Sequence, residues 1–199
     1  MKAALEELVA QVLDGTELEL KVDTLKLEED LETGKASVRC EVHHAQTGEK
    51  KIITGTGVGI VDAFFSGLVA LYREDFPSLN TIRFSDFSAK ADLDTGRHDS
   101  RTDSAATVAL VVTNASGRDF RFEDTSTSIT RSSINVVLAA VEFFINSERA
   151  FKAVYRALQH AKEHNRADSV ALYTSQLATL VEATSYSEVI EQLRSDEQG

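Results

Sequence analysis

The same break in an alternating hydrophobic pattern occurs twice in this sequence, and no other feature constrains the fold as strongly. In each case apolar residues alternate with polar ones, slip by one position, and continue in the other phase. The first set is Leu20, Val22, Leu25 and Leu27, and the second, at a constant offset, is Ile82, Phe84, Phe87 and Ala89. A slip of one residue flips the buried face of a strand, as a β-bulge or a strongly bent strand does. Two equivalent slips therefore predict an internal duplication.

The elements that follow each slip support the duplication. In the first half we expect a second strand at 36–44, a turn at Thr47-Gly48, a third strand at 50–54 and a helix at 61–74. In the second half we expect strands at 104–113 and 119–123, a turn at Ser116-Gly117, a helix at 130–146 and a longer loop at 94–103. The predicted fold class is α+β, with a duplicated βββα unit forming a two-layer domain and a helical extension after it.

This pattern divides the chain into three segments. They are an N-terminal helix at 1–15, the duplicated domain at 16–146 with units of about 16–76 and 80–146, and the helical extension at 147–199. Both unit helices are apolar on more than one face, with Phe65 and Phe143 lying off the main stripes. A helix on an open sheet needs only one apolar face. Two sheets with the helices between them, or a homodimer packed helix to helix, would each bury the surplus.

Composition argues against several classes of partner. The net charge of −11 argues against nucleic-acid binding, which depends on Lys and Arg to neutralise phosphates. No uncharged apolar run reaches the roughly 18 residues of a membrane helix, and Glu6 and Glu7 interrupt the start where a secretory signal is apolar. We therefore expect a cytoplasmic protein without membrane contact.

The single cysteine, Cys40, shares a strand face with valines and is predicted to be a buried, inert thiol.

The most distinctive local sequence is Gly-Thr-Gly-Val-Gly-Ile-Val-Asp-Ala, residues 55–63, between an expected strand and an apolar helix. Alternate glycines permit a tight turn with exposed N–H groups, and a helix N-terminus favours an anion such as a carboxylate. A phosphate loop fits poorly because lysine is missing, and so does a dinucleotide fingerprint because its third glycine and parallel strand are missing. Two interpretations stay open: the glycines only shape the turn, or they form part of a carboxylate site.

This glycine signature resembles the C-terminal regulatory domain of α-isopropylmalate synthase and citramalate synthase. In the second unit, Asp86-Phe87-Ser88-Ala89 and Thr102-Asp103-Ser104-Ala105 are similar to further motifs of that family. The resemblance covers about residues 18–146. It implies a domain that forms part of a dimer and binds leucine or isoleucine between its two units. The bound ligand then inhibits a catalytic barrel, that of an acyltransferase, elsewhere in the chain. This sequence has no counterpart of that barrel.

The resemblance implies ligand-binding residues in two groups. They are Gly55, Gly57, Val58, Gly59, Asp62 and Ala63 in the first unit, and Ser126, Thr127, Ser128 and Ser133 in the second. The second group departs from the family, whose corresponding loop is rich in glycine. Serine and threonine stand there instead, and Arg131 falls where the family tends to be acidic. A loop of this kind can still cap a helix and hydrogen-bond a ligand.

No catalytic residue, metal site or cofactor is predicted. His43 and His44 are adjacent, so on a strand their rings point to opposite faces. His160 and His164 can share a helix face, but without a nearby third ligand they are expected to be surface histidines. The leading hypothesis is a non-catalytic, homodimeric sensor of a branched-chain amino acid or similar small carboxylate. The alternatives are a ligand-free dimerisation or scaffold protein docking on a separately encoded synthase, and a fragment of a longer synthase.

Overall fold

The computed structural model describes residues 2–91, 105–184 and 186–196. The loop expected at 94–103, and most of the motif at 102–105, lie outside the described residues. The first unit comprises β1 (Leu20–Asp30), β2 (Lys35–His44), β3 (Lys50–Val58) and α2 (Gly59–Tyr72). The second comprises β4 (Arg83–Ala91), β5 (Ala106–Thr113), β6 (Asp119–Ser126) and α3 (Ile129–Glu163). Each unit has an antiparallel sheet with its strands in chain order, so the duplicated βββα fold is confirmed.

Both predicted phase slips are β-bulges at equivalent positions. In β1 the register shifts after Val22, which pairs with Val42, so that Asp23 is the extra residue. In β4 the register shifts after Phe84, which pairs with Val112, so that Ser85 is the extra residue. A bulge of this kind changes which face of the strand later side chains occupy. The hydrophobic pattern therefore located the two irregularities to within one residue.

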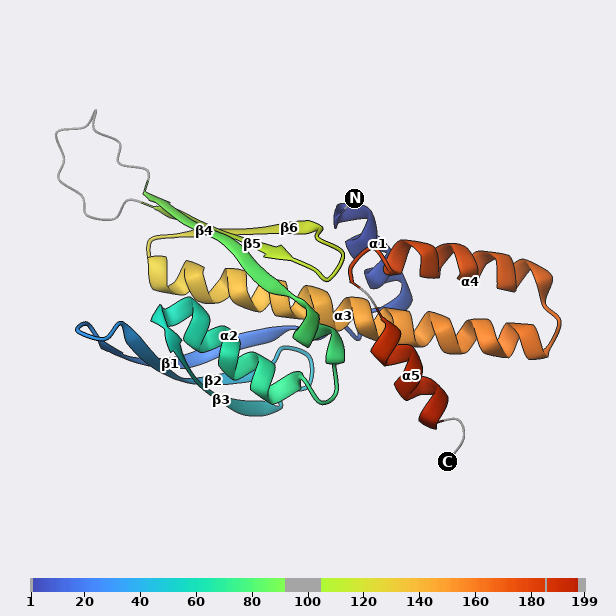
Figure 1. Ribbon diagram of the computed structural model, residues 1–199, viewed down its shortest axis with the longest axis horizontal. Helices are drawn as coiled ribbons and strands as arrows, with labels where there is room; N and C mark the ends of the chain where they lie inside the picture. The colour runs from blue at the N-terminus through green and yellow to red at the C-terminus, as the bar shows by residue number, and fades with distance from the viewer. Residues whose placement is uncertain (1, 92–104, 185, 197–199) are drawn as a thin grey trace.

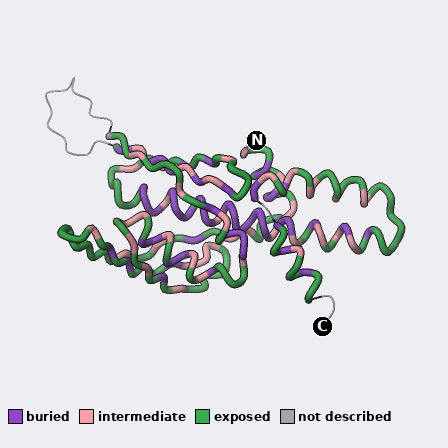
Figure 2. The backbone as a smooth tube through the Cα atoms, in the orientation of Figure 1, coloured by how far each residue is buried: buried purple, intermediate pink, exposed green. Residues whose placement is uncertain are grey.

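The two helices lie between the two sheets (Figure 1). Helix α2 packs on β2 and β3, α3 packs on β5 and β6, and the helices contact each other. Each helix also contacts the opposite unit. The ring centroids of Phe65 on α2 and Phe84 on β4 lie 4.2 Å apart. The Glu142 carboxylate on α3 accepts the N–H of Leu20 on β1 at 2.6 Å. The first of the two arrangements expected from the sequence is therefore present, and it explains the apolar faces beyond the main stripes. Figure 2 shows the resulting line of buried residues along α3.

Helix α3 does not end near Asn146, as the sequence predicted, but continues to Glu163. No proline or glycine stands between these positions, and Ser147, Glu148 and Ala150 are all buried, so neither sequence nor solvent exposure interrupts the helix. By length and composition alone, α3 could span a membrane, and no other described helix could; 67% of its most apolar window is buried within the protein. Such burial is what a central core helix shows.

The remaining helices cover one end of the sandwich. They are α1 (Lys2–Leu13), which packs on α3 as the predicted N-terminal helix, the 3₁₀ turn η1 (Pro77–Thr81), α4 (Ala167–Leu180) and α5 (Ser187–Asp196). Helix α4 runs back along α3 as a hairpin (Figure 1). Its apolar side chains are buried unequally: Leu172 and Val181 are half exposed, whereas Leu180 is fully buried. Tyr186, just before α5, stacks on Phe151 of α3 with ring centroids 4.2 Å apart.

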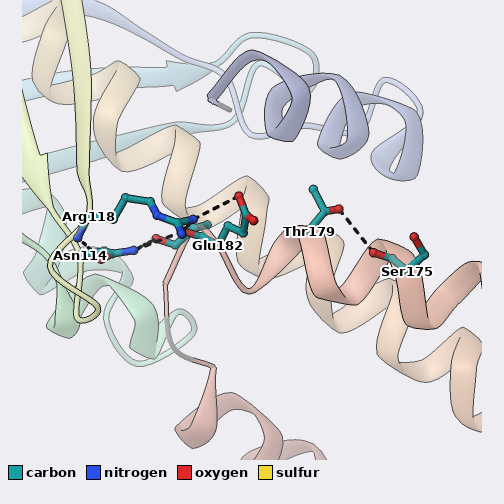
Figure 3. Close-up of polar contacts among 6 residues, drawn as sticks. Asn114, Arg118, Ser175, Thr179 and Glu182 are labelled. Carbon is teal, nitrogen blue, oxygen red and sulfur yellow. Dashed lines mark hydrogen bonds and ion pairs between the residues drawn. The ribbon is translucent and has the colours of Figure 1, made fainter.

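Polar contacts tie this helical extension to the second sheet (Figure 3). The side-chain amide of Asn114, in the β5–β6 turn, donates to the carbonyl oxygen of Ala183 at 2.8 Å. Arg118 from the same turn donates to the Glu182 carbonyl at 3.2 Å and pairs with the Glu182 carboxylate at 3.1 Å. Glu182 and Ala183 follow directly after α4, so the turn provides partners for backbone carbonyl groups just beyond that helix.

Candidate functional site

The glycine segment is a strand end and a helix start, not the loop that the sequence suggested. Strand β3 continues through Gly55 and Gly57 to Val58. A Cβ on Gly55 would lie 2.6 Å from the backbone nitrogen of Gly67 on α2 and would meet the carbonyl oxygen of Ala63. Real Cβ atoms do not approach backbone so closely, so Gly55 is glycine because the helix lies directly on the strand.

The rest of the first predicted group shapes the entry into α2. A Cβ on Gly57 would lie 2.6 Å from the backbone nitrogen of Ala63, which is fully buried. Gly59 has a φ of +75° in open space, the left-handed region that glycine adopts without cost. The Asp62 carboxylate accepts the N–H of Val58 at 2.9 Å, so it satisfies a backbone donor of its own turn.

The second predicted group forms the equivalent entry into α3 with hydroxyl groups. Ser126 ends β6 and its Oγ lies 2.8 Å from the Oγ of Ser132. Ser128 is the N-cap of α3 and accepts the N–H of Arg131 at 3.2 Å. Thr127 is exposed between them and Ser133 is buried. The side chains thus take over a capping role that the first unit leaves to Asp62.

Equivalent positions of the two sheets differ in how closely strand and helix approach. Gly55 pairs with Val38 in the first sheet, and Asp124 pairs with Val108 at the matching place in the second. Where Gly55 meets helix backbone, the Asp124 carboxylate accepts a hydrogen bond from the Asn135 side chain of α3 at 3.3 Å. The second unit therefore places polar side chains where the first has direct backbone packing.

Two surface cavities border the predicted residues. The first, of about 630 Å³, lies at the end of the first sheet and includes Gly57 and Val58 among its walls. Its other walls include the acidic residues Glu28, Glu29 and Asp30. Lys35 is the one cation among the described residues of this lining, and three carboxylates outweigh it. Because like charges repel, this cavity suits a carboxylate ligand poorly.

The second cavity, of about 520 Å³, is a groove between β1 of the first unit and the start of α3 in the second. Its lining residues are Leu20, Lys21, Val22, Asp23, Leu25, Ser128, Thr130, Arg131, Ile134, Asn135 and Leu138. The groove combines cations with an apolar wall, and Asp23, the bulged residue of β1, adds a carboxylate that contacts His43 Nδ1 at 2.8 Å. Its volume is that of a small-molecule site.

Of the predicted ligand-binding residues, Ser128 lines the groove, and Gly57 and Val58 line the first cavity. The others line neither cavity; they are Gly55, Gly59, Asp62, Ala63, Ser126, Thr127 and Ser133. The α2 and α3 N-termini do lie at the same end of the molecule (Figure 1). Sequence reasoning missed the β1 side of the groove and treated Arg131 only as a departure from a pattern. The signal that could have located it was the β1 bulge, because a bulge re-aims a side chain, here that of Asp23.

Comparison with known families agrees with this architecture. Residues 1–145 match the family described as the LeuA allosteric (dimerisation) domain. The chain belongs to this family. No curated protein matches the chain significantly. As a LeuA allosteric domain, the chain is a regulatory, dimerising module, and the resemblance of its glycine signature to isopropylmalate synthase regulatory domains is confirmed. The family match ends inside α3, so the second half of that helix, α4 and α5 extend beyond it.

Proposed function

We propose that this LeuA allosteric domain is a non-catalytic, cytoplasmic homodimer that senses a branched-chain amino acid or a similar small carboxylate. The proposed role is regulation in leucine- or isoleucine-type biosynthesis. The observation that carries the proposal is the groove of about 520 Å³ between β1 and the start of α3. A ligand in it contacts both βββα units at once, so its binding energy depends on their relative position.

The groove offers a partner for each part of an amino acid. The guanidinium of Arg131 and the positive end of the α3 dipole attract a carboxylate. Asp23 provides a negative charge for an ammonium group. Leu25, Ile134 and Leu138 provide an apolar wall for a branched side chain. A 2-keto or 2-hydroxy acid would use the same contacts except the one to Asp23.

Isothermal titration calorimetry against leucine, isoleucine, valine and the related 2-keto and 2-hydroxy acids tests this site. We expect one of them to bind, and Arg131→Gln to weaken its binding by about tenfold or more, the loss expected for one charged hydrogen bond. Arg121→Gln is the matched control, because Arg121 is exposed on β6 and pairs only locally with Glu123. Absence of heat and of any thermal shift with every ligand would refute sensing; equal losses in both variants would place the ligand elsewhere.

Exposed apolar side chains support dimerisation at the end where both helices begin. Leu31 in the β1–β2 turn is 88% exposed, Val58 is 77% exposed and Ile129 is 51% exposed. Figure 1 shows the β1–β2 hairpin projecting beyond the start of α2 at this end. We expect Leu31→Glu with Val58→Glu to shift a dimer toward monomer in analytical ultracentrifugation. Leu172→Glu, at a half-exposed position of α4, is the control and leaves the dimer intact.

A ligand-free scaffold that docks on a separately encoded synthase is the second candidate. It is favoured by the loss of glycine in the second unit, where Asp124 stands at the position equivalent to Gly55. Co-purification from the native host separates the two. A scaffold brings down a barrel-containing partner whether or not amino acid is added, whereas a sensor changes its stability or association when the amino acid binds.

A further inference from the structure

The last turn of α3 carries three side chains with metal-ligating atoms on one face. His160, Glu163 and His164 each offer one donor atom, and these atoms lie within 4.8 Å of one another. Residues three and four positions apart are neighbours on a helix surface, so the helix itself sets this arrangement. No other group of three such ligands occurs in the part of the chain that the structure describes. The sequence analysis considered His160 and His164 as a pair and missed Glu163 as a third donor beside them.

The hydrogen bonding of His164 leaves its other ring nitrogen available. Its Nδ1 lies 2.9 Å from the carbonyl oxygen of His160. A carbonyl oxygen only accepts, so Nδ1 carries the proton, and Nε2 of the neutral ring keeps its lone pair for a metal. A backbone carbonyl commonly orients a metal-bound histidine in this way.

The surroundings also favour a cation. His164 is the C-cap of α3, where unpaired carbonyl groups give the helix end a partial negative charge. The rings of His160 and His164 have centroids 4.1 Å apart, and all three side chains are exposed, so the ligands can close on an ion without displacing the core.

We propose that this turn binds one divalent transition-metal ion of the Zn²⁺ class through His160, Glu163 and His164. Two imidazoles and one carboxylate form a donor set that zinc, nickel and copper accept, with water completing the coordination. Figure 1 places the end of α3 at the tip of its hairpin with α4, whereas the groove is lined by residues near the start of α3. This site is therefore independent of the proposed amino-acid sensing, and binding would stabilise the last turn of α3.

The test is calorimetric titration of the full chain, free of any histidine tag, with ZnCl₂ and separately with NiCl₂. We expect one ion per chain and an increase in thermal stability. His160→Ala and His164→Ala should each lower the affinity at least about tenfold, a loss that even removal of a ligand's hydrogen-bond partner can produce. Glu163→Gln should lower it less, because the amide still offers an oxygen.

His43→Ala is the matched control, since His43 contacts Asp23 on the first sheet and should leave metal binding unchanged. Circular dichroism without metal confirms that each variant folds, so a lost heat signal reports on the ligands. The proposal is overturned if wild-type protein takes up no ion, or if the His160 and His164 variants bind as tightly as wild type. One ion per two chains, with metal-dependent association, would also overturn it.

Discussion

The side-chain amide of Asn114 donates to the carbonyl oxygen of Ala183 at 2.8 Å, although 69 positions separate the two residues. The carbonyl oxygen of the same Asn114 side chain accepts the N–H groups of Ser116 and Arg118, each at 2.9 Å. Asn114 is only 1% exposed. One buried side chain thus closes the β5–β6 turn and attaches to it the segment that follows α4.

Asn114→Ala is expected to lower the free energy of unfolding by about 1–3 kcal/mol or more, because buried donors and acceptors lose their partners. Urea unfolding monitored by circular dichroism measures the loss. Arg118→Ala is the comparison: it removes a partly exposed ion pair with Glu182, worth about 1 kcal/mol or less. A similar loss for both variants would contradict the view that burial of Asn114 makes this joint strong.

Gly55→Ala should destabilise the fold, because the added Cβ meets the backbone of α2 at Ala63 and Gly67 and backbone cannot move aside cheaply. Overpacking of this kind typically costs about 1–3 kcal/mol. Gly59→Asn is the matched control, since Gly59 has a positive φ but no neighbouring atom within 4 Å, and asparagine tolerates that conformation. Thermal denaturation of both variants measures the difference. If Gly55→Ala were as stable as Gly59→Asn, α2 would be able to move away from β3.

Lys152→Met should cost about 3–5 kcal/mol, because it leaves the fully buried carboxylate of Glu148 without its cation at 2.7 Å. The double variant Lys152→Met with Glu148→Gln should recover most of this loss. The glutamine oxygen can still accept the N–H of Ser78, now 3.0 Å from Glu148 Oε2, and no buried charge remains. Denaturant unfolding of both variants measures the recovery, and a double variant as unstable as the single one would argue against charge burial as the cause.

Glu142 predicts a pH dependence of stability. Burial, with a smaller contribution from the charge of Glu19, raises the pKa of Glu142 from 4.5 to about 7, although the Leu20 N–H opposes the shift. The folded state then holds this proton more tightly than the unfolded state. The stability contributed by Glu142 is fully present below about pH 4.5 and is lost as the pH rises through 7.

Glu142→Gln keeps an oxygen for Leu20 and has no proton to lose. We expect this variant to match wild type near pH 4 and to exceed it at pH 8 by about 3 kcal/mol, the value for a shift of this size. Urea unfolding across this pH range measures the difference, with the exposed Glu123→Gln as control. Curves for Glu142→Gln and wild type that stay parallel would exclude Glu142 as the cause.

Much of the fold was predictable because it follows from local periodicity. The slips after Val22 and Phe84 became bulges at those places. Cys40, predicted to be buried from strand alternation, is fully buried, and burial raises the pKa of its thiol to about 11. These features depend on which face of one element a residue occupies, and the sequence records that directly.

Features that depend on contacts between distant segments were not predictable in the same way. The burial of Glu148 on α3 against Ser78 joins residues 70 positions apart. The groove joins Asp23 to Arg131 across the two units, and no local pattern connects them. The glycines at 55 and 57 were read as a loop because their spacing is identical whether they turn the chain or admit a neighbouring helix.

The duplicated architecture has a consequence for how this chain can diverge. Its helical layer has the arrangement of an interface between two copies of one βββα unit, now joined in a single polypeptide. In an ordinary symmetric dimer each substitution appears twice and must suit both halves. Here Gly55 and Asp124 occupy matching positions with different neighbours. One unit can thus keep its close strand-to-helix packing while the other acquires different side chains. Two identical subunits cannot differ in this way.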